Sequence, residues 1–186
     1  MRIENIKRNY TVETALVHFP LHPETPAEGR TLQDLFPGRT ADDIEAMYAR
    51  MKGLMEAEGL PYGRRTHTYN SRLAQELGKW ADTQPDGEAL HDAFYRAYFV
   101  DARNIGAEDV MLEVVDSVGL PVEAAREVLA TRSFKDAVDG DWKKSHEYGV
   151  TGVPTFVAGG YGVVGAQPYE ALERLVTQAG AQARGG

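Results

Sequence analysis

The segment Gly149–Phe156 reads Gly-Val-Thr-Gly-Val-Pro-Thr-Phe, and its residue types suit the binding of an extended chain. Pro154 follows Val153 at a predicted helix-to-strand connection, and an X-Pro bond adopts the cis form at a cost of roughly 0.5–1 kcal/mol. A cis proline before an edge strand turns backbone N–H and C=O groups outward, where they can pair with an extended peptide or a glutathione backbone. A proline that merely starts a strand would show the same pattern. We predict a substrate-binding site that contains Gly152, Val153, Pro154 and Thr155.

Two histidines near the other end of the chain are the next candidates for chemistry. His18 and His22 have an even separation and would share one face of a strand. Neither has a carboxylate or thiolate companion at metal-ligand spacing, so we predict no metal site. Phe19 and His22 are instead expected to line a cleft that faces the Pro154 turn. The sequence contains no phosphate-binding loop, no dinucleotide-binding glycine pattern and no serine elbow.

The composition limits the partners. The 186 residues include 28 acidic and 20 basic side chains, which gives a formal net charge of -8. A chain this acidic is not expected to bind nucleic acid or an anionic membrane. No apolar run is long enough to span a bilayer, and the N-terminal residues lack the apolar core of a secretory signal. With no such signal and no cysteine, the expected location is the cytoplasm.

Apolar periodicity predicts a helical middle of the chain. Residues 1–10 read as a helix, and Val12–Phe19 reads as a strand that Pro20 ends. Thr40 and Asp43 form a capping box, and the apolar stripe behind them, with Met47 and Met51, predicts a helix that contributes to a core. Further helices are expected near residues 71–80, 90–98, 110–118, 121–129 and 133–148.

The period changes beyond Gly149. Thr155–Ala158 and Tyr161–Val164 flank Gly159-Gly160, which predicts a β-hairpin. Pro168 then opens a last helix with Leu172 and Leu175 on its core face. Strands at both ends of the chain, interrupted by a block of helices, predict the α/β class.

These motifs together resemble one protein family. Gly149–Leu175, with its Gly-Val-Pro-Thr-Phe and Gly-Ala-Gln-Pro motifs, resembles the C-terminal part of the DsbA-like thioredoxin family, in its FrnE-like branch. Val17–Gly29 resembles a loop of the same branch, and residues 70–74 and 90–99 resemble its helical insertion. The resemblance implies a thioredoxin-like part, residues 1–39 and 149–180. It also implies an α-helical insertion domain, residues 40–148, that includes the connecting helix.

The sequence departs from the family where the chemistry would lie. The family begins with a central strand and a Cys-Pro-Trp-Cys motif, whereas this chain starts within the following helix and contains no cysteine. About 20–25 residues of the family pattern have no counterpart, so we expect an N-terminally truncated fold. Because thiolate sulfur is the nucleophile of disulfide exchange, we expect no catalytic residue in this chain. The strands beside the missing one would have open edges. We therefore expect either that the natural protein starts upstream of residue 1 or that the chain covers these edges by forming a homodimer.

Three functions remain open. The first is a DsbA-like, FrnE-like thiol–disulfide oxidoreductase whose Pro154 turn holds the substrate and whose exchange activity is absent from this chain. The second is a glutathione-binding enzyme of the same superfamily, related to the 2-hydroxychromene-2-carboxylate isomerases and kappa-class transferases. The third is a non-catalytic module that holds an extended peptide. The expected partner is therefore a peptide or a glutathione-like extended substrate, and no cofactor other than glutathione is expected.

Overall fold

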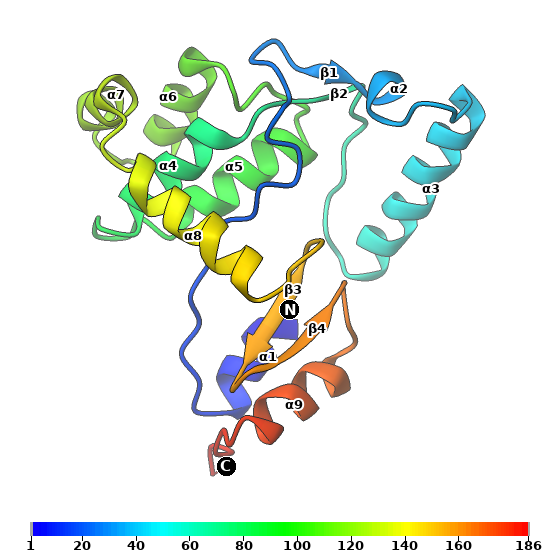
Figure 1. Cartoon of the computed structure of the whole chain (residues 1–186), viewed down its shortest axis with the longest axis vertical. Helices are drawn as coiled ribbons and strands as arrows, with labels where there is room; N and C mark the ends of the chain where they lie inside the picture. The colour runs from blue at the N-terminus through cyan, green and yellow to red at the C-terminus, as the bar shows by residue number, and fades with distance from the viewer. Residues whose placement is uncertain (1, 186) are drawn as a thin grey trace. The chain divides into compact units, whose positions relative to one another are not determined.

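The structure is a computed structural model of the chain, and it describes residues 2–185 (Figure 1). The chain divides into two compact units, one formed by Met1–Leu21 with Asp141–Gly186 and the other by His22–Gly140. Both contain helices and a small antiparallel sheet, so the predicted α/β class is confirmed. The predicted domain boundaries at 39/40 and 148/149 stay a prediction. None of the described helices is both long and apolar enough to cross a membrane.

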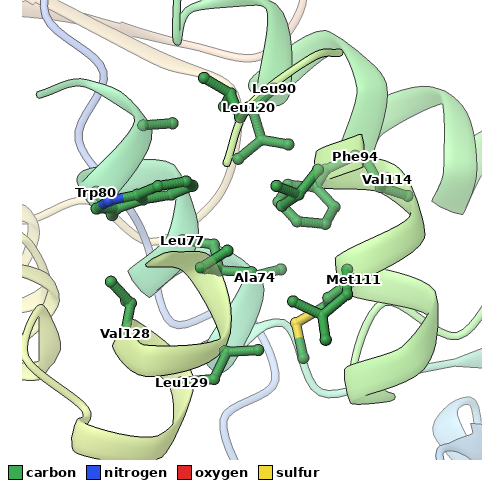
Figure 2. Packing of buried hydrophobic residues seen from close by; sticks show 14 of the residues in the cluster. Ala74, Leu77, Trp80, Leu90, Phe94, Met111, Val114, Leu120, Val128 and Leu129 are labelled. Carbon is green, nitrogen blue, oxygen red and sulfur yellow. The ribbon is translucent and has the colours of Figure 1, made fainter. Parts of the chain in front are cut away.

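Four helices build the core of the unit His22–Gly140. They are α4 (Arg72–Ala81), α5 (Ala89–Phe99), α6 (Glu108–Ser117) and α7 (Val122–Thr131). Their apolar residues recur at helical spacing, as Ala74, Leu77 and Ala81 do on α4, and such a stripe must be buried against a neighbour. Figure 2 shows the resulting cluster, in which Leu77 and Trp80 of α4 lie among side chains of α5, α6 and α7.

One ionised side chain is buried beside this core. Glu76 is fully buried, and its carboxylate accepts hydrogen bonds from Arg72 on its own helix, at 2.6 Å, and from Arg132, at 2.6 and 2.7 Å. Arg132 follows α7 with a left-handed backbone (φ 54°), an uncommon conformation for a residue with a side chain. Arg72 also pairs with Asp139 of α8 (Lys135–Glu147) at 2.6 Å. The Glu76 cluster thus links α4 to α8 and to the residue that follows α7.

The rest of this unit is a small sheet and two helices. β1 (Arg30–Thr31) pairs antiparallel with β2 (His67–Thr68), and α2 (Leu32–Leu35) follows β1 directly. α3 (Ala41–Ala57) begins with the predicted capping box, in which Thr40 and Asp43 bond each other's backbone N–H groups. The prediction that its stripe is core is wrong, because Met47 and Met51 are 42% and 43% exposed and no residue of α3 is buried. Amphipathic spacing makes a face suitable for burial, but a neighbouring element must be present to bury it.

The unit Met1–Leu21 with Asp141–Gly186 is built around one hairpin. β3 (Thr155–Ala158) pairs antiparallel with β4 (Tyr161–Val164), as predicted. α9 (Tyr169–Gln178) packs against both strands and against α1 (Arg2–Asn9), with Leu172, Leu175 and Ile6 buried (Figure 1). Tyr10 and Tyr169 hold α1 and α9 together through Glu173, whose carboxylate accepts from both hydroxyls.

The segment between α1 and the unit boundary is not a strand. Residues 12–19 were predicted to form one, but they enter no β-ladder. Leu16 and Val17 remain exposed, and the backbone N–H of His18 donates to Asp141 of α8 at 3.0 Å. A β-prone sequence becomes a strand only where a second strand supplies hydrogen bonds. Within residues 2–185, no strand forms a β-ladder with residues 12–19.

Candidate functional site

The chain reaches the Pro154 turn through a defined helix end. Gly149 has a left-handed backbone (φ 67°), and its N–H donates to the carbonyl of His146 at 2.9 Å. The N–H of Val150 donates to the carbonyl of Ser145 at 3.0 Å. This pair of bonds is the Schellman motif, which satisfies the last carbonyls of a helix and which glycine forms without steric cost. Gly149 therefore ends α8 and directs the chain toward the turn.

The turn between Gly152 and Thr155 is stabilised by a side-chain hydrogen bond. The hydroxyl of Thr155 donates to the carbonyl of Gly152 at 2.7 Å, and the Val153–Pro154 peptide bond is cis. Val153 is 52% exposed and Pro154 is exposed as well. The turn thus presents an apolar surface directly before β3.

The hairpin that follows has a fixed hydrogen-bond register. Thr155 lies opposite Val164 and Ala158 lies opposite Tyr161. Gly159 and Gly160 both have positive φ, 56° and 82°, as the two central residues of a type I′ hairpin turn require. The tight turn therefore fixes the pairing of β3 with β4 along their whole length.

This register determines which backbone groups of β3 remain available. The N–H of Gly165 donates to the carbonyl of Pro154 at 2.7 Å, so positions 154, 156 and 158 bond to β4. In an antiparallel ladder the intervening residues point their N–H and C=O groups the other way. Thr155 and Val157 therefore direct both backbone groups to the outer edge of β3. Among residues 2–185 these groups have no hydrogen-bond partner.

The outer edge of β4 differs from that of β3. The side-chain amide of Gln167 donates to the carbonyl of Val164 at 2.6 Å, which occupies an acceptor that would otherwise face outward. The guanidinium of Arg2 holds the same loop by donating to the carbonyls of Ala166 and Gln167, at 3.1 and 2.7 Å. Within the described part of the chain, the outer edge of β3 is consequently more open than that of β4.

The two faces of the hairpin also differ. Phe156 and Val163 lie opposite each other on one face and are half-buried, whereas Val157 and Val164 lie on the other face and are 41% and 55% exposed. An exposed apolar face beside an open strand edge is a surface that a further strand can cover. No Asp, Glu, Lys, Arg or His occurs between Tyr148 and Tyr169, so the hairpin and its flanking turns contribute no charged side chain.

The predicted site residues do not all lie in the same unit of the chain. Gly152, Val153, Pro154 and Thr155 form the turn and the start of β3. Phe19 lies in the same unit and is half-buried, and its place in a cleft at the turn stays a prediction. His22 belongs to the other unit, where its imidazole lies 3.9 Å from the carboxylate of Glu24, so its predicted role also stays a prediction.

Two residues of this edge were not predicted from the sequence. Val157 contributes half of the available backbone groups, and Gln167 occupies the competing acceptor on β4. Along Thr155–Ala158, residues alternately bond to β4 and face outward. This alternation would have identified Val157 once one hydrogen-bonded position was known. Within residues 2–185, no group of three or more acidic, histidine or cysteine side chains is arranged to hold a metal ion.

Comparisons with known proteins identify the fold and the family of the chain. The model of the DSBA-like thioredoxin domain matches residues 1–177. The chain is 31% identical to a probable DsbA oxidoreductase, SCO1869, from Streptomyces coelicolor, whose crystal structure superposes with a TM-score of 0.87 over 96% of this chain and 81% of that one. A putative protein disulfide isomerase from Nitrosomonas europaea shares the fold, with a TM-score of 0.60, 14% identity and coverage of 75% and 74%.

A curated relative is the uncharacterized protein YwbO of Bacillus subtilis, which is 28% identical over 112 residues. That match covers 60% of this chain and spans about half, 56%, of the relative's length. The family match nevertheless extends over nearly all of the present sequence and includes both the hairpin and the helical block. This chain belongs to the family of DSBA-like thioredoxin domains.

Proposed function

We propose that this chain holds an extended polypeptide along the outer edge of β3, and that it does so as the substrate-binding part of a DsbA-like, FrnE-like thiol–disulfide oxidoreductase. The observation that carries the proposal is the set of backbone groups on Thr155 and Val157 that point away from β4. An extended peptide adds to such an edge by pairing its own N–H and C=O groups with them. The neighbouring valines would contact its alternate side chains.

The similarity to a probable DsbA oxidoreductase supports the link to disulfide chemistry. The 186 residues contain no cysteine, so in this proposal they bind the polypeptide and do not carry out the thiol–disulfide exchange. Any exchange on a bound peptide requires thiols from outside this sequence. A glutathione-like ligand, which also has an extended backbone, is the alternative occupant of the same edge.

The test removes one outward N–H group. A short fluorescein-labelled peptide of alternating valine and threonine residues would be titrated with the protein while its fluorescence anisotropy is recorded. Val157→Pro deletes an outward donor of β3, and Val164→Pro is the matched control because it deletes an outward donor of β4. We expect Val157→Pro to weaken binding about threefold to tenfold, the effect of one hydrogen bond, and Val164→Pro to bind normally.

Equal binding by Val157→Pro and the unchanged protein would show that β3 is not the binding edge. Circular dichroism of both variants would establish that each hairpin is folded. The glutathione alternative is tested by a titration to millimolar concentration that follows the fluorescence of Trp142 on α8. If the fluorescence change saturates with glutathione and the peptide does not bind, the ligand of this edge is glutathione and not a polypeptide.

A further inference from the structure

A small cavity lies beside the Glu76 cluster, within the unit His22–Gly140. Its volume is about 230 Å³, which corresponds to roughly seven to eight water molecules of ~30 Å³ each. The wall is formed by the loop before β1, the segment that opens α4, the loop before α6 and the residue after α7. The six wall residues are Ala27, Asn70, Arg72, Leu73, Gly106 and Arg132. A cavity of this volume admits a ligand of only a few non-hydrogen atoms.

Arg132 is the wall residue whose side chain has hydrogen-bond donors to spare. A guanidinium has five N–H groups, and those on Nε and Nη2 of Arg132 donate to Glu76 at 2.7 and 2.6 Å. Its Nη1 donates to no residue within the described part of the chain. The side chain is 42% exposed, so a small molecule can reach it. The other arginine of the wall, Arg72, already has a partner at each of its three nitrogen atoms.

The charged side chains at this cavity have one positive charge in excess. Arg72 and Arg132 both bond to Glu76 at 2.6 Å. Asp139 pairs with Arg72 and with Lys135, also at 2.6 Å. Carboxyl groups paired with cations in this way are ionised at neutral pH. Three cations and two anions leave a net charge of +1, which one monoanion would neutralise and a dianion would reverse.

The rest of the wall offers no further polar side chain to a ligand. The side-chain amide of Asn70 donates to the carbonyl of Thr25 at 2.7 Å, and its oxygen accepts from the backbone N–H of Arg72 at 2.9 Å. The remaining wall residues, Ala27, Leu73 and Gly106, have no polar side chain. A ligand that suits this cavity is therefore anionic at one end and apolar at the other.

We propose that this cavity binds a small aliphatic monocarboxylate. Its carboxylate pairs with the outer edge of the Arg132 guanidinium, because two N–H groups of arginine match the two oxygens of a carboxylate. Its carbon chain contacts Leu73 and Ala27. The site is separate from the β3 edge, which belongs to the other unit, so it does not rest on the proposed function.

Titration of the nitrogen-15-labelled protein with sodium butyrate at pH 7 tests the site by NMR. We expect saturable shifts of the backbone amides of Leu73, Gly106 and Arg132, with a dissociation constant of about 1–10 mM, a range that suits about six non-hydrogen atoms. Butyramide has nearly the same shape without the charge, and it should bind at least about tenfold more weakly. Sodium chloride at the same ionic strength corrects for general effects of salt.

Ala27→Leu should block the cavity while it leaves the Glu76 cluster unchanged. Ala27 is exposed, so the added carbons can enter the cavity without displacing a buried neighbour. We expect this variant to raise the dissociation constant for butyrate at least about tenfold. Ala46→Leu on α3 is the matched control, because it adds the same carbons to an exposed alanine that is not part of the wall.

Arg132→Lys tests the guanidinium itself. Lysine keeps the positive charge but lacks the paired N–H groups, so binding of butyrate should weaken about threefold to tenfold. This variant also loses a hydrogen bond to Glu76, and circular dichroism establishes whether it is folded. Butyrate binding that is unchanged in folded Arg132→Lys would overturn the assignment of the carboxylate to this guanidinium.

Four other results would overturn the proposal. Butyrate that causes no saturable shift would show that the cavity holds no such ligand. Equal affinities of Ala27→Leu and the unchanged protein would place butyrate elsewhere. Equal affinities for butyrate and butyramide would show that charge is not recognised. Inorganic phosphate that saturates the same amides at a lower concentration than butyrate would exclude a monocarboxylate as the preferred ligand.

Discussion

The backbone N–H of Gly165 donates to the carbonyl oxygen of Pro154 at 2.7 Å. This bond extends the β3–β4 ladder by one position beyond the strands and fixes its parity, so that Thr155 and Val157 face outward. Gly165 also has a φ of 89°, which is unfavourable for residues with a β-carbon. The outward direction of the Thr155 and Val157 backbone groups therefore depends on a bond made by a glycine, Gly165, directly after β4.

Replacement of Gly165 by alanine should destabilise the hairpin. We expect a loss of about 1–2 kcal/mol in the free energy of unfolding, since an L residue is strained at this backbone conformation. Gly162→Ala is the control, because Gly162 has no positive φ and an added β-carbon would make only ordinary contacts at 3.8 and 3.9 Å. Urea denaturation monitored by circular dichroism measures both. An equal effect of the two substitutions would contradict the special role of Gly165.

The Glu76 cluster should be essential to the helical unit. Glu76→Ala leaves Arg72 and Arg132 without their shared carboxylate, and breaking a buried ion pair in this way costs about 3–5 kcal/mol. Glu113→Ala removes a carboxylate that is 68% exposed and paired with Arg103, so its effect should stay within about 0.5 kcal/mol. Thermal unfolding at pH 7 compares the stabilities of the two variants with that of the unchanged protein. Similar melting temperatures would show that the buried pair contributes little.

The same cluster should make the protein sensitive to acid. Burial raises the pKa of the Glu76 carboxyl, but the hydrogen bonds and charges of Arg132 and Arg72 together exceed this effect and hold the pKa below its ordinary value of 4.5. Hydrogen bonds from Lys135 and Arg72 likewise lower the pKa of Asp139 below 3.8. A carboxylate with a lowered folded-state pKa stabilises the fold above the unfolded value and loses that contribution as the pH falls through the folded value.

Stability should therefore be constant from neutral pH down to about pH 5 and then fall toward pH 3. Glu76→Gln cannot titrate at this position, so its decline over the same interval should be smaller, although the variant is less stable throughout. Urea midpoints measured at half-unit steps of pH give both profiles. Parallel profiles for the variant and the unchanged protein would mean that other carboxyl groups cause the acid sensitivity.

The chain should have no disulfide-exchange activity by itself. It contains no cysteine, and no other side chain replaces the attacking thiolate. Insulin reduction with dithiothreitol and oxidation of a dithiol peptide should both proceed at the rate of the buffer. Turnover that co-purifies with the protein through size exclusion and scales with its concentration would contradict this expectation.

Local features were predictable because neighbouring residues determine them. Thr40 and Asp43 form their capping box within a single turn, and Gly159-Gly160 between two β-prone runs specifies a tight hairpin. Val12–Phe19 had the same local propensity as β3, yet it is not a strand, because a strand also needs a partner that only the folded chain can supply. Met47 and Met51 are exposed for a related reason, since their spacing specifies a face but not a neighbour.

The amino-acid sequence by itself determined the absence of cysteine from these 186 residues, the uncharged segment around Pro154 and the hairpin that follows it, since composition and short-range spacing are sufficient for each. Only the tertiary structure decided that, among residues 2–185, the outer edge of β3 is more open than that of β4. That choice depends on Gln167 reaching back to Val164, on Arg2 holding the same loop from α1, and on the parity set by Gly165 and Pro154. Arg2 comes from a distant part of the chain, and packing brings it to the hairpin.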